Sequence, residues 1–186
     1  GIYFDDAAPL AGIPEDALAM FAAAAQSEGK TGYKIGLQIP HYLAVIQYAD
    51  NRELREQIYR AYVTRASELS DDGKFDNTAN IDRTLANALQ TAKLLGFKNY
   101  AELSLATKWR TRRTSLNFLH DLARRAKPYA EKDLAEVKAF ARESLNLADL
   151  QPWDLGYASE KLREAKYAFS ETEVKKYFPV GKVLNG

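Results

Sequence analysis

Residues 114–145 read TSLNFLHDLARRAKPYAEKDLAEVKAFARESL, and this stretch decides the fold class. Its apolar side chains recur at steps of three and four residues, which is the spacing of one face of an α-helix. They are Leu116, Leu119, Ala123, Ala126, Ala130, Leu134, Val137, Ala141 and Leu145. About 30 residues at a rise of about 1.5 Å each predict a helical rod of about 45 Å. Because Pro128 inside it removes a backbone hydrogen bond and clashes one turn back, we expect a kink near residues 124–127.

Helix-start and helix-stop residues extend the helical prediction to most of the chain. Pro14 is expected at the first position of one helix, with two acidic residues in its first turn. Either Asp50 or Asn51 caps another helix, and Gly96 ends a further one. The predicted helices span about residues 14–29, 40–49, 52–66, 78–95 and 152–169, with short ones after Asn99 and from a capping box at residues 170–173.

One stretch has the alternation of a β-strand. Residues 32–39 place Tyr33, Ile35 and Leu37 on one side, and the segment around Tyr3 is an edge that can pair with it. The sequence therefore predicts an all-α fold. We expect a helical bundle with a long kinked helix and at most one small β-hairpin near the N-terminus, forming a single helical segment over residues 1–186.

The composition excludes several classes of protein. Among 186 residues, 26 Lys and Arg balance 25 Asp and Glu, so a net charge of +1 does not favour nucleic acid or an anionic membrane. The absence of cysteine excludes disulfides and thiolate metal sites, and it fits a reducing compartment. No apolar run approaches the ~18 residues of a membrane span, and the first residues lack the pattern of a signal peptide. We expect a cytoplasmic protein.

The two histidines, His41 and His120, do not form a metal motif. Neither belongs to a His-Glu-x-x-His pair, and two isolated histidines cannot complete a closed zinc site without carboxylates. His41 at a helix start is interpreted as a surface or boundary residue, and His120 beside Asp121 is interpreted in the same way. We therefore assign no metal ligand and no catalytic residue to this chain.

Other catalytic patterns are missing or have the wrong spacing. Adjacent acids at 5–6, 15–16 and 71–72 lie in a helix start or in loops, where acids cap or are solvated rather than converge across a cleft. The stretch 71–76 lacks the alternating acids and the final Glu of a calcium loop. There is no Gly-x-Ser-x-Gly word and no phosphate-binding glycine loop. Substrate-binding residues stay unassigned.

A basic cluster precedes the long predicted helix and continues along it. Its members are Arg110, Arg112, Arg113, Arg124, Arg125 and Lys127. Such a cluster can contact phosphates. The aromatic side chains of a single-strand binder are missing apart from Trp109, so the cluster is interpreted as a solvated face and no nucleic-acid partner is predicted.

Several words of sequence together resemble a known family. They are YFDDAAPLAGIPED at 3–16, YADNR at 48–52, YRAYVTRAS at 59–67, LLGF at 94–97, SLATK at 104–108, QPWD at 151–154 and YFP at 177–179. Each word alone is weak, but the combination covers nearly the whole chain. The chain resembles part of the thimet oligopeptidase family of zinc metallopeptidases.

The resemblance implies a place in a larger enzyme. Members of this family are long, mostly helical proteins whose two lobes flank a deep channel that admits short, unfolded peptides. Their zinc polarises the scissile carbonyl and activates water, while a glutamate acts as general base. All these catalytic residues lie beyond the point that matches Gly186, so none is carried onto this chain. The chain is expected to supply one channel wall, to bind no zinc itself, and to have the missing catalytic lobe as its partner.

Two departures from the family pattern stand out. Relatives often have two tyrosines after the Trp-Asp word, whereas here Tyr157 is followed by Ala158. If the second tyrosine ring of the relatives faces the channel, its absence here alters the substrate contacts. Relatives also tend to read Met-Ala-Asp-Thr-Pro where residues 109–113 read WRTRR. The codons ATGGCGGACACGCCG, read one base later, give Trp-Arg-Thr-Arg, so we hypothesise a local frameshift over residues 109–114. Resequencing that finds these arginines encoded without compensating insertions or deletions would contradict it.

The sequence thus predicts a fragment of a zinc metallo-oligopeptidase that hydrolyses short cytoplasmic peptides, including cleaved signal peptides. The segment itself is predicted to be inactive. The alternative is an autonomous helical protein-interaction module. Self-association through exposed apolar faces is expected in either case, because a separated wall exposes faces that another lobe covers. Saturable binding to a defined protein partner would distinguish the module.

Overall fold

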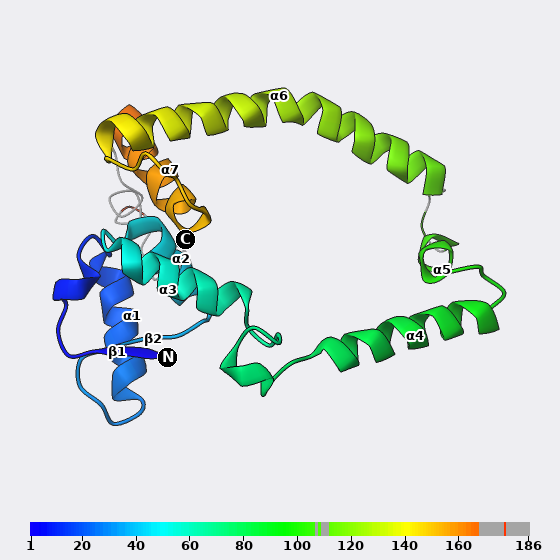
Figure 1. The fold of residues 1–186 in the computed structure, drawn as a ribbon, viewed down its shortest axis with the longest axis horizontal. Coiled ribbons are helices and arrows are strands. Elements are labelled where there is room, and N and C mark those ends of the chain that lie inside the picture. Colours follow the sequence, from blue (N-terminus) through cyan, green and yellow to red (C-terminus); the bar gives the residue numbers. More distant parts are fainter. Residues whose placement is uncertain (107, 109–111, 168–176, 178–186) are drawn as a thin grey trace. The chain divides into compact units, whose positions relative to one another are not determined.

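The computed structural model describes residues 1–106, 108, 112–167 and 177. Over these residues the chain is mostly helical, with a two-stranded antiparallel sheet near the N-terminus (Figure 1). This confirms the all-α prediction. The two strands are separated in sequence by a helix, so they pair as a small sheet rather than across a tight hairpin turn. Among the described residues, no helix combines the length and the apolar character that crossing a membrane requires.

The chain divides into two compact units. Unit 1 consists of residues 1–63 and 136–186, and unit 2 consists of residues 64–135. Unit 1 contains the sheet and most of the buried core. The expectation of a single helical segment over residues 1–186 stays a prediction.

The sheet pairs strand β1, Ile2–Phe4, with β2, Tyr33–Ile35, and Tyr3 lies opposite Lys34. This confirms the pairing expected around Tyr3. The strand is shorter than the predicted span of residues 32–39 because the backbone leaves the ladder after Ile35. The amide N–H of Gly36 donates to the ring of His41 instead of to a neighbouring strand.

Three helices build the centre of unit 1. They are α1 (Glu15–Gln26), α2 (Ile39–Tyr48) and α3 (Arg52–Val63). Asn51 rather than Asp50 provides the side-chain cap of α3, since its Oδ1 accepts from the backbone N–H of Leu54 at 3.1 Å. Nine of the buried apolar residues form one cluster, made of Leu10, Ile13, Phe21, Ile35, Ala44, Val45, Ala49, Leu54 and Ile58.

Helix α3 ends earlier than predicted. The expected apolar face continued to Ala66, but the helix stops at Val63 and Ala66 has a left-handed φ of 58°. The side-chain oxygen and the backbone N–H of Ser67 both donate to the carbonyl of Thr64, at 2.6 and 3.1 Å, and this local turn replaces the helical bonds.

Helix α7, Pro152–Tyr167, completes unit 1 by packing against α2 and α3 (Figure 1). Gly156 makes the close approach to α2 possible. A Cβ atom at this position would lie 2.8 Å from Cγ2 of Ile46, so any larger residue would push the two helices apart. The predicted end at Phe169 and the capping box at residues 170–173 lie outside the described residues.

Unit 2 contains α4, Thr78–Leu94, and α5, Tyr100–Ala106, which contact each other. Asn99 caps α5, because its Oδ1 accepts from the backbone N–H of Glu102 at 3.0 Å. Gly96 follows α4 with a left-handed φ of 82°, as the helix-stop prediction requires. A short 3-10 helix, Asp71–Gly73, precedes α4, and another, Ala8–Leu10, precedes α1 in unit 1.

The longest helix, α6, runs from Arg112 to Ser144 and confirms the periodicity of residues 114–145. It continues through Pro128 without ending. The kink near residues 124–127 stays a prediction. Of the predicted basic cluster, Arg110 lies outside the described residues, together with Trp109 and Thr111.

Alanine substitution of two glycines tests the β1–β2 contact. Gly29 and Gly32 both have left-handed φ, 70° and 79°, so alanine costs about 1–2 kcal/mol at either position. At Gly32 the added Cβ would also lie 2.2 Å from the carbonyl oxygen of Phe4, whereas at Gly29 it meets nothing within 4 Å. We expect Gly32→Ala to lower the free energy of unfolding clearly more than Gly29→Ala, measured by urea denaturation. Equal losses would contradict this packing of the strands.

Candidate functional site

The two histidines of the sequence belong to different units. His120 lies exposed on α6 in unit 2, and His41 belongs to unit 1. The interpretation of His41 as a surface or boundary residue is wrong, because its side chain is only 8% exposed. Its ring packs against Phe21 with the ring centres 5.0 Å apart. In the part of the chain that the structure describes, no three His, Cys, Asp or Glu side chains gather in a way that could hold a metal ion.

Unit 1 instead contains an ion cluster in which two buried residues, Arg55 and Asp154, pair with each other and Asp154 also pairs with the partly exposed Arg52; we call it the Asp154 cluster. Helix α3 supplies the two arginines one turn apart, and the first turn of α7 supplies the aspartate. Asp154 is completely buried and Arg55 is 1% exposed. Charges this deep are stable only when they are paired and hydrogen-bonded.

The carboxylate of Asp154 is bonded on both oxygens. Arg55 Nη2 donates to Oδ1 at 2.8 Å, and Arg52 donates from Nη2 to Oδ2 at 2.7 Å and from Nε at 3.0 Å. The backbone N–H of Gln151 adds a bond to Oδ2 at 3.1 Å, which also caps the start of α7. The cluster therefore links α3 to α7 by charge-assisted bonds with fixed geometry.

These bonds keep Asp154 ionised. Burial alone would raise the pKa of Asp154, but the hydrogen bonds from Arg52, from Arg55 and from the Gln151 backbone together lower it below its usual value. The hydrogen bond to Asp154 in turn raises the pKa of Arg52. A carboxylate held in this state is a poor general acid or base near neutral pH. The cluster can therefore clamp two helices, but it cannot transfer protons.

Arg55 also holds the end of α2. Its Nη1 donates to the carbonyls of Ala49 at 2.7 Å and Asp50 at 3.2 Å. Its guanidinium carbon lies 4.2 Å from the ring centre of Tyr157. Its Nε is buried without a hydrogen-bond partner among the described residues. One arginine thus joins the α2–α3 turn, α3 and α7.

Tyr157 and Asp50 close the cluster on its outer side. The hydroxyl of Tyr157 donates to Oδ1 of Asp50 at 2.8 Å. Burial raises the pKa of Tyr157 to about 12, and the hydrogen bond to the Asp50 carboxylate acts in the same direction. The next residue, Ala158, is completely buried. A second aromatic ring at this position would need space that the packing of unit 1 does not provide.

The sequence reading missed this cluster. Arg55 lies next to Leu54 and three residues before Ile58 on the apolar side of α3, and a charge on an apolar face indicates a buried partner. The word QPWD was noted for the resemblance without a role for its aspartate. No local pattern identifies that aspartate as the partner, because 99 residues separate Asp154 from Arg55.

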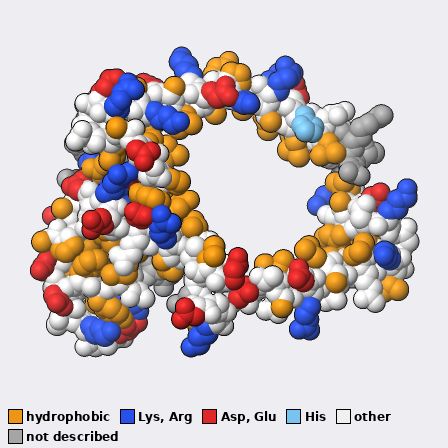
Figure 2. All heavy atoms as spheres, in the orientation of Figure 1, with side chains coloured by type: hydrophobic (Ala, Val, Ile, Leu, Met, Phe, Trp, Pro, Cys, Tyr) orange, Lys and Arg blue, Asp and Glu red, His pale blue; other side chains and the backbone are white. Residues whose placement is uncertain are grey.

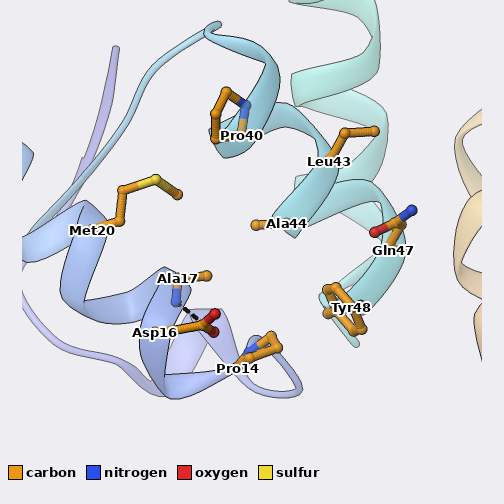
Figure 3. A pocket seen from close by; sticks show the side chains of 9 residues that line it. All are labelled: Pro14, Asp16, Ala17, Met20, Pro40, Leu43, Ala44, Gln47 and Tyr48. Atoms are coloured by element: carbon orange, nitrogen blue, oxygen red, sulfur yellow. Dashed lines mark hydrogen bonds between the residues drawn. The ribbon is translucent and has the colours of Figure 1, made fainter. Parts of the chain in front are cut away.

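Two of the concave regions in unit 1 involve the helices α1 to α3. A cavity of about 320 Å³ lies between α1 and α2 (Figure 3). Its lining residues are Pro14, Asp16, Ala17, Met20, Pro40, Leu43, Ala44, Gln47 and Tyr48. A second cleft, of about 460 Å³, lies beside the Asp154 cluster and is lined by Arg52, Glu53, Glu56, Asp149, Gln151 and Trp153. Neither contains a nucleophile next to a base, so neither is a catalytic centre by its own residues.

The comparisons with known proteins agree on one family. Residues 45–186 match the sequence profile described as peptidase family M3. The chain is 47% identical over 183 residues to Oligopeptidase A of Salmonella typhimurium and to Oligopeptidase A of Escherichia coli. It is 42% identical over 189 residues to Probable cytosolic oligopeptidase A of Arabidopsis thaliana. Each comparison covers 97% of this chain, but the chain spans only 27% of the bacterial relatives and 26% of the plant one.

Removing Asp154 tests the ion cluster. Asp154→Ala leaves Arg55 buried without its counter-charge, so we expect a loss of about 3–5 kcal/mol in the free energy of unfolding. Glu56→Ala is the matched control, because Glu56 pairs with Arg60 at the surface of α3, and exposed pairs contribute less than about 1 kcal/mol. Urea denaturation of the two variants gives both values. Similar losses would contradict the clamp.

The same cluster predicts acid sensitivity. A carboxyl whose pKa is lowered by folding stabilises the protein fully above its unfolded value of 3.8, and this contribution is lost as the pH falls below it. The free energy of unfolding, measured between pH 5 and pH 2.5, should therefore fall as the pH is lowered. We expect a smaller fall in the Asp154→Asn variant. The same pH dependence in both proteins would contradict the assignment.

Proposed function

The chain belongs to peptidase family M3, and from this membership we propose that it is a segment of a zinc-dependent oligopeptidase that hydrolyses short peptides. Within that enzyme the segment supplies part of the wall of the substrate channel. The observation that carries the proposal is the identity of 47% to Oligopeptidase A over nearly the whole chain. Since the chain spans about a quarter of that relative, 27%, peptide hydrolysis is proposed for the longer protein and not for this segment.

We assign the zinc chemistry to residues outside this chain. A catalytic zinc site needs three protein ligands from His, Cys, Asp or Glu, with one coordination position open. The residues that the structure describes do not offer such a donor set. The two histidines lie in different units, and each is without the second histidine of a zinc motif. The segment is therefore proposed to be inactive alone.

Exposed apolar side chains in unit 2 support the role as part of a larger assembly. Ile81, Leu85 and Leu89 follow one face of α4 at four-residue steps and are 56%, 64% and 41% exposed. Figure 2 shows apolar side chains gathered along this helix and along α6. Exposed apolar stripes of this kind mark surfaces that another protein part covers. The missing catalytic lobe is the proposed partner, and self-association is expected when it is absent.

The second candidate function is an autonomous helical protein-interaction module. The exposed face of α4 also favours this alternative, because such a face can dock a separate protein. The two candidates differ in what the longer protein does. A module binds its partner without hydrolysing peptides, whereas a channel wall becomes part of an active enzyme.

The proposed compartment is the cytoplasm. The name of the plant relative contains the word cytosolic. The chain has no cysteine, which suits a reducing compartment. Substrates of the longer enzyme are proposed to be short cytoplasmic peptides, including cleaved signal peptides.

Peptide hydrolysis and bound zinc, measured on two proteins, test the proposal. One is the chain of residues 1–186, and the other is the longer protein encoded at the same locus. We expect the longer protein to cleave short peptides, to bind zinc at one equivalent, and to lose activity when a chelator removes the metal. The chain alone should neither cleave peptides nor bind stoichiometric zinc, because it offers no donor set.

Each outcome separates the candidates. Tight zinc at one equivalent on the chain alone, with peptide cleavage, would contradict the channel-wall proposal. A longer protein that never cleaves peptides, while the chain binds a defined partner with saturation, would establish the interaction module.

A further inference from the structure

His41 makes a hydrogen bond that exists in only one of its protonation states. The backbone N–H of Gly36 donates to Nδ1 of His41 at 3.1 Å. An imidazole nitrogen accepts a hydrogen bond only when it carries no proton. The ring is therefore neutral in this structure, and its single proton is on Nε2. If the ring became an imidazolium, two donors would face each other and the bond to Gly36 would be lost.

The surroundings of His41 favour the neutral state. The ring is 8% exposed and packs on Phe21, which is the α1 side chain against it and carries no charge. The positive charge of Lys34 on β2 acts on the ring, and Lys34 is itself paired with Glu28. Burial lowers the pKa of His41 below its usual value, and the positive charge of Lys34 lowers it further.

The bond holds the turn that joins β2 to α2. Gly36 has left the sheet, so its N–H has His41 as the partner in place of a ladder bond. The carbonyl of Gln38 then accepts the first helical bond of α2, from the N–H of Tyr42 at 2.9 Å. The position of the first turn of α2 therefore depends on this segment.

The first turns of α2 also form one wall of the α1–α2 cavity. Pro40 and Leu43 lie on that wall, and Met20 lies opposite them on α1 (Figure 3). His41 is the residue directly after Pro40. A movement of the β2–α2 turn would therefore change the surroundings of Met20.

We propose that His41 is a pH-sensitive latch of unit 1. In its neutral state it closes the β2–α2 turn and fixes the α2 wall of the cavity. When the pH falls, its protonation breaks the bond to Gly36, releases the turn and opens that wall. The latch is independent of peptide hydrolysis, because it lies within unit 1 and uses only residues of this chain.

The direction of the pH effect follows from the lowered pKa. Above about pH 6.5, His41 is neutral in the folded and the unfolded chain, so it adds no pH dependence. As the pH falls below that value, the unfolded chain binds a proton that the folded chain resists. The unfolding equilibrium constant then rises by up to about tenfold for each pH unit, until the folded chain is protonated as well. This window lies well above the one in which Asp154 is protonated.

Two NMR measurements on the chain of residues 1–186 test the latch. Long-range nitrogen–proton spectra of the His41 ring report the tautomer directly, and the neutral form with the proton on Nε2 is expected. The chain has one methionine, so a single methyl signal reports on the cavity. As the pH is lowered from 7.5, we expect the Gly36 amide signal and the Met20 methyl signal to change together with the His41 ring signals. A ring that becomes protonated while the Gly36 and Met20 signals stay constant would overturn the proposal. A proton on Nδ1 at pH 7.5 would overturn the proposal, whatever the variants do.

Two matched variants separate the latch from other titrating groups. His41→Asn replaces Nδ1 with an amide that can accept from Gly36 but cannot be protonated. Its Gly36 and Met20 signals, and its unfolding constant, should stay unchanged between pH 7.5 and pH 5. His120→Asn removes the other histidine, which is exposed on α6, and should keep the response of the unsubstituted chain. A Met20 signal that moves equally in His41→Asn would overturn the proposal. So would a pH dependence of unfolding that disappears in His120→Asn.

Discussion

The buried carboxylate of Asp154 is the constraint on which unit 1 depends. Its two oxygens accept from Arg55 and from Arg52, so α7 is fixed to α3 by bonds that a purely apolar contact would not orient. Arg55 carries the same constraint to the end of α2 through the carbonyls of Ala49 and Asp50. Replacing the whole cluster by apolar residues would cost little, whereas removing Asp154 alone would leave Arg55 buried without its counter-charge.

The clamp also explains how unit 1 tolerates its discontinuous sequence. Residues 64–135 form another unit between its two parts. The entropy of closing a loop grows only with the logarithm of its length, so bringing Asp154 to Arg55 across 99 residues costs little more than closing a shorter loop. Specific pairing matters more than sequence distance. A bidentate arginine–carboxylate contact supplies that pairing, together with the close approach of α7 to α2 at Gly156.

The sequence predicted features that depend on local residues and missed features that depend on distant partners. Local patterns predicted α6, the cap at Asn99, a cap at either Asp50 or Asn51, and the pairing around Tyr3, because these depend on residues close in sequence or on a regular pattern. They failed at Ala66, where side-chain bonds of Ser67 end α3. They also failed at Arg55 and Asp154, since the burial of each charge depends on a partner far along the chain. The interpretation of His41 as a surface or boundary residue failed because its burial depends on packing against Phe21 and on a backbone turn at Gly36, which no residue pattern indicates.

Unit 2 lacks a comparable clamp in its first helix. Helix α4 contacts α5, yet its face of Ile81, Leu85 and Leu89 stays largely open. Burying an Ile or Leu side chain completely contributes about 1.5–3 kcal/mol, so covering this face would add several kcal/mol that the described chain does not realise. The proposed role as a channel wall accounts for this open face, since the remainder of a longer protein is its proposed cover. Under that proposal, the stability of unit 2 depends on the surface that covers α4.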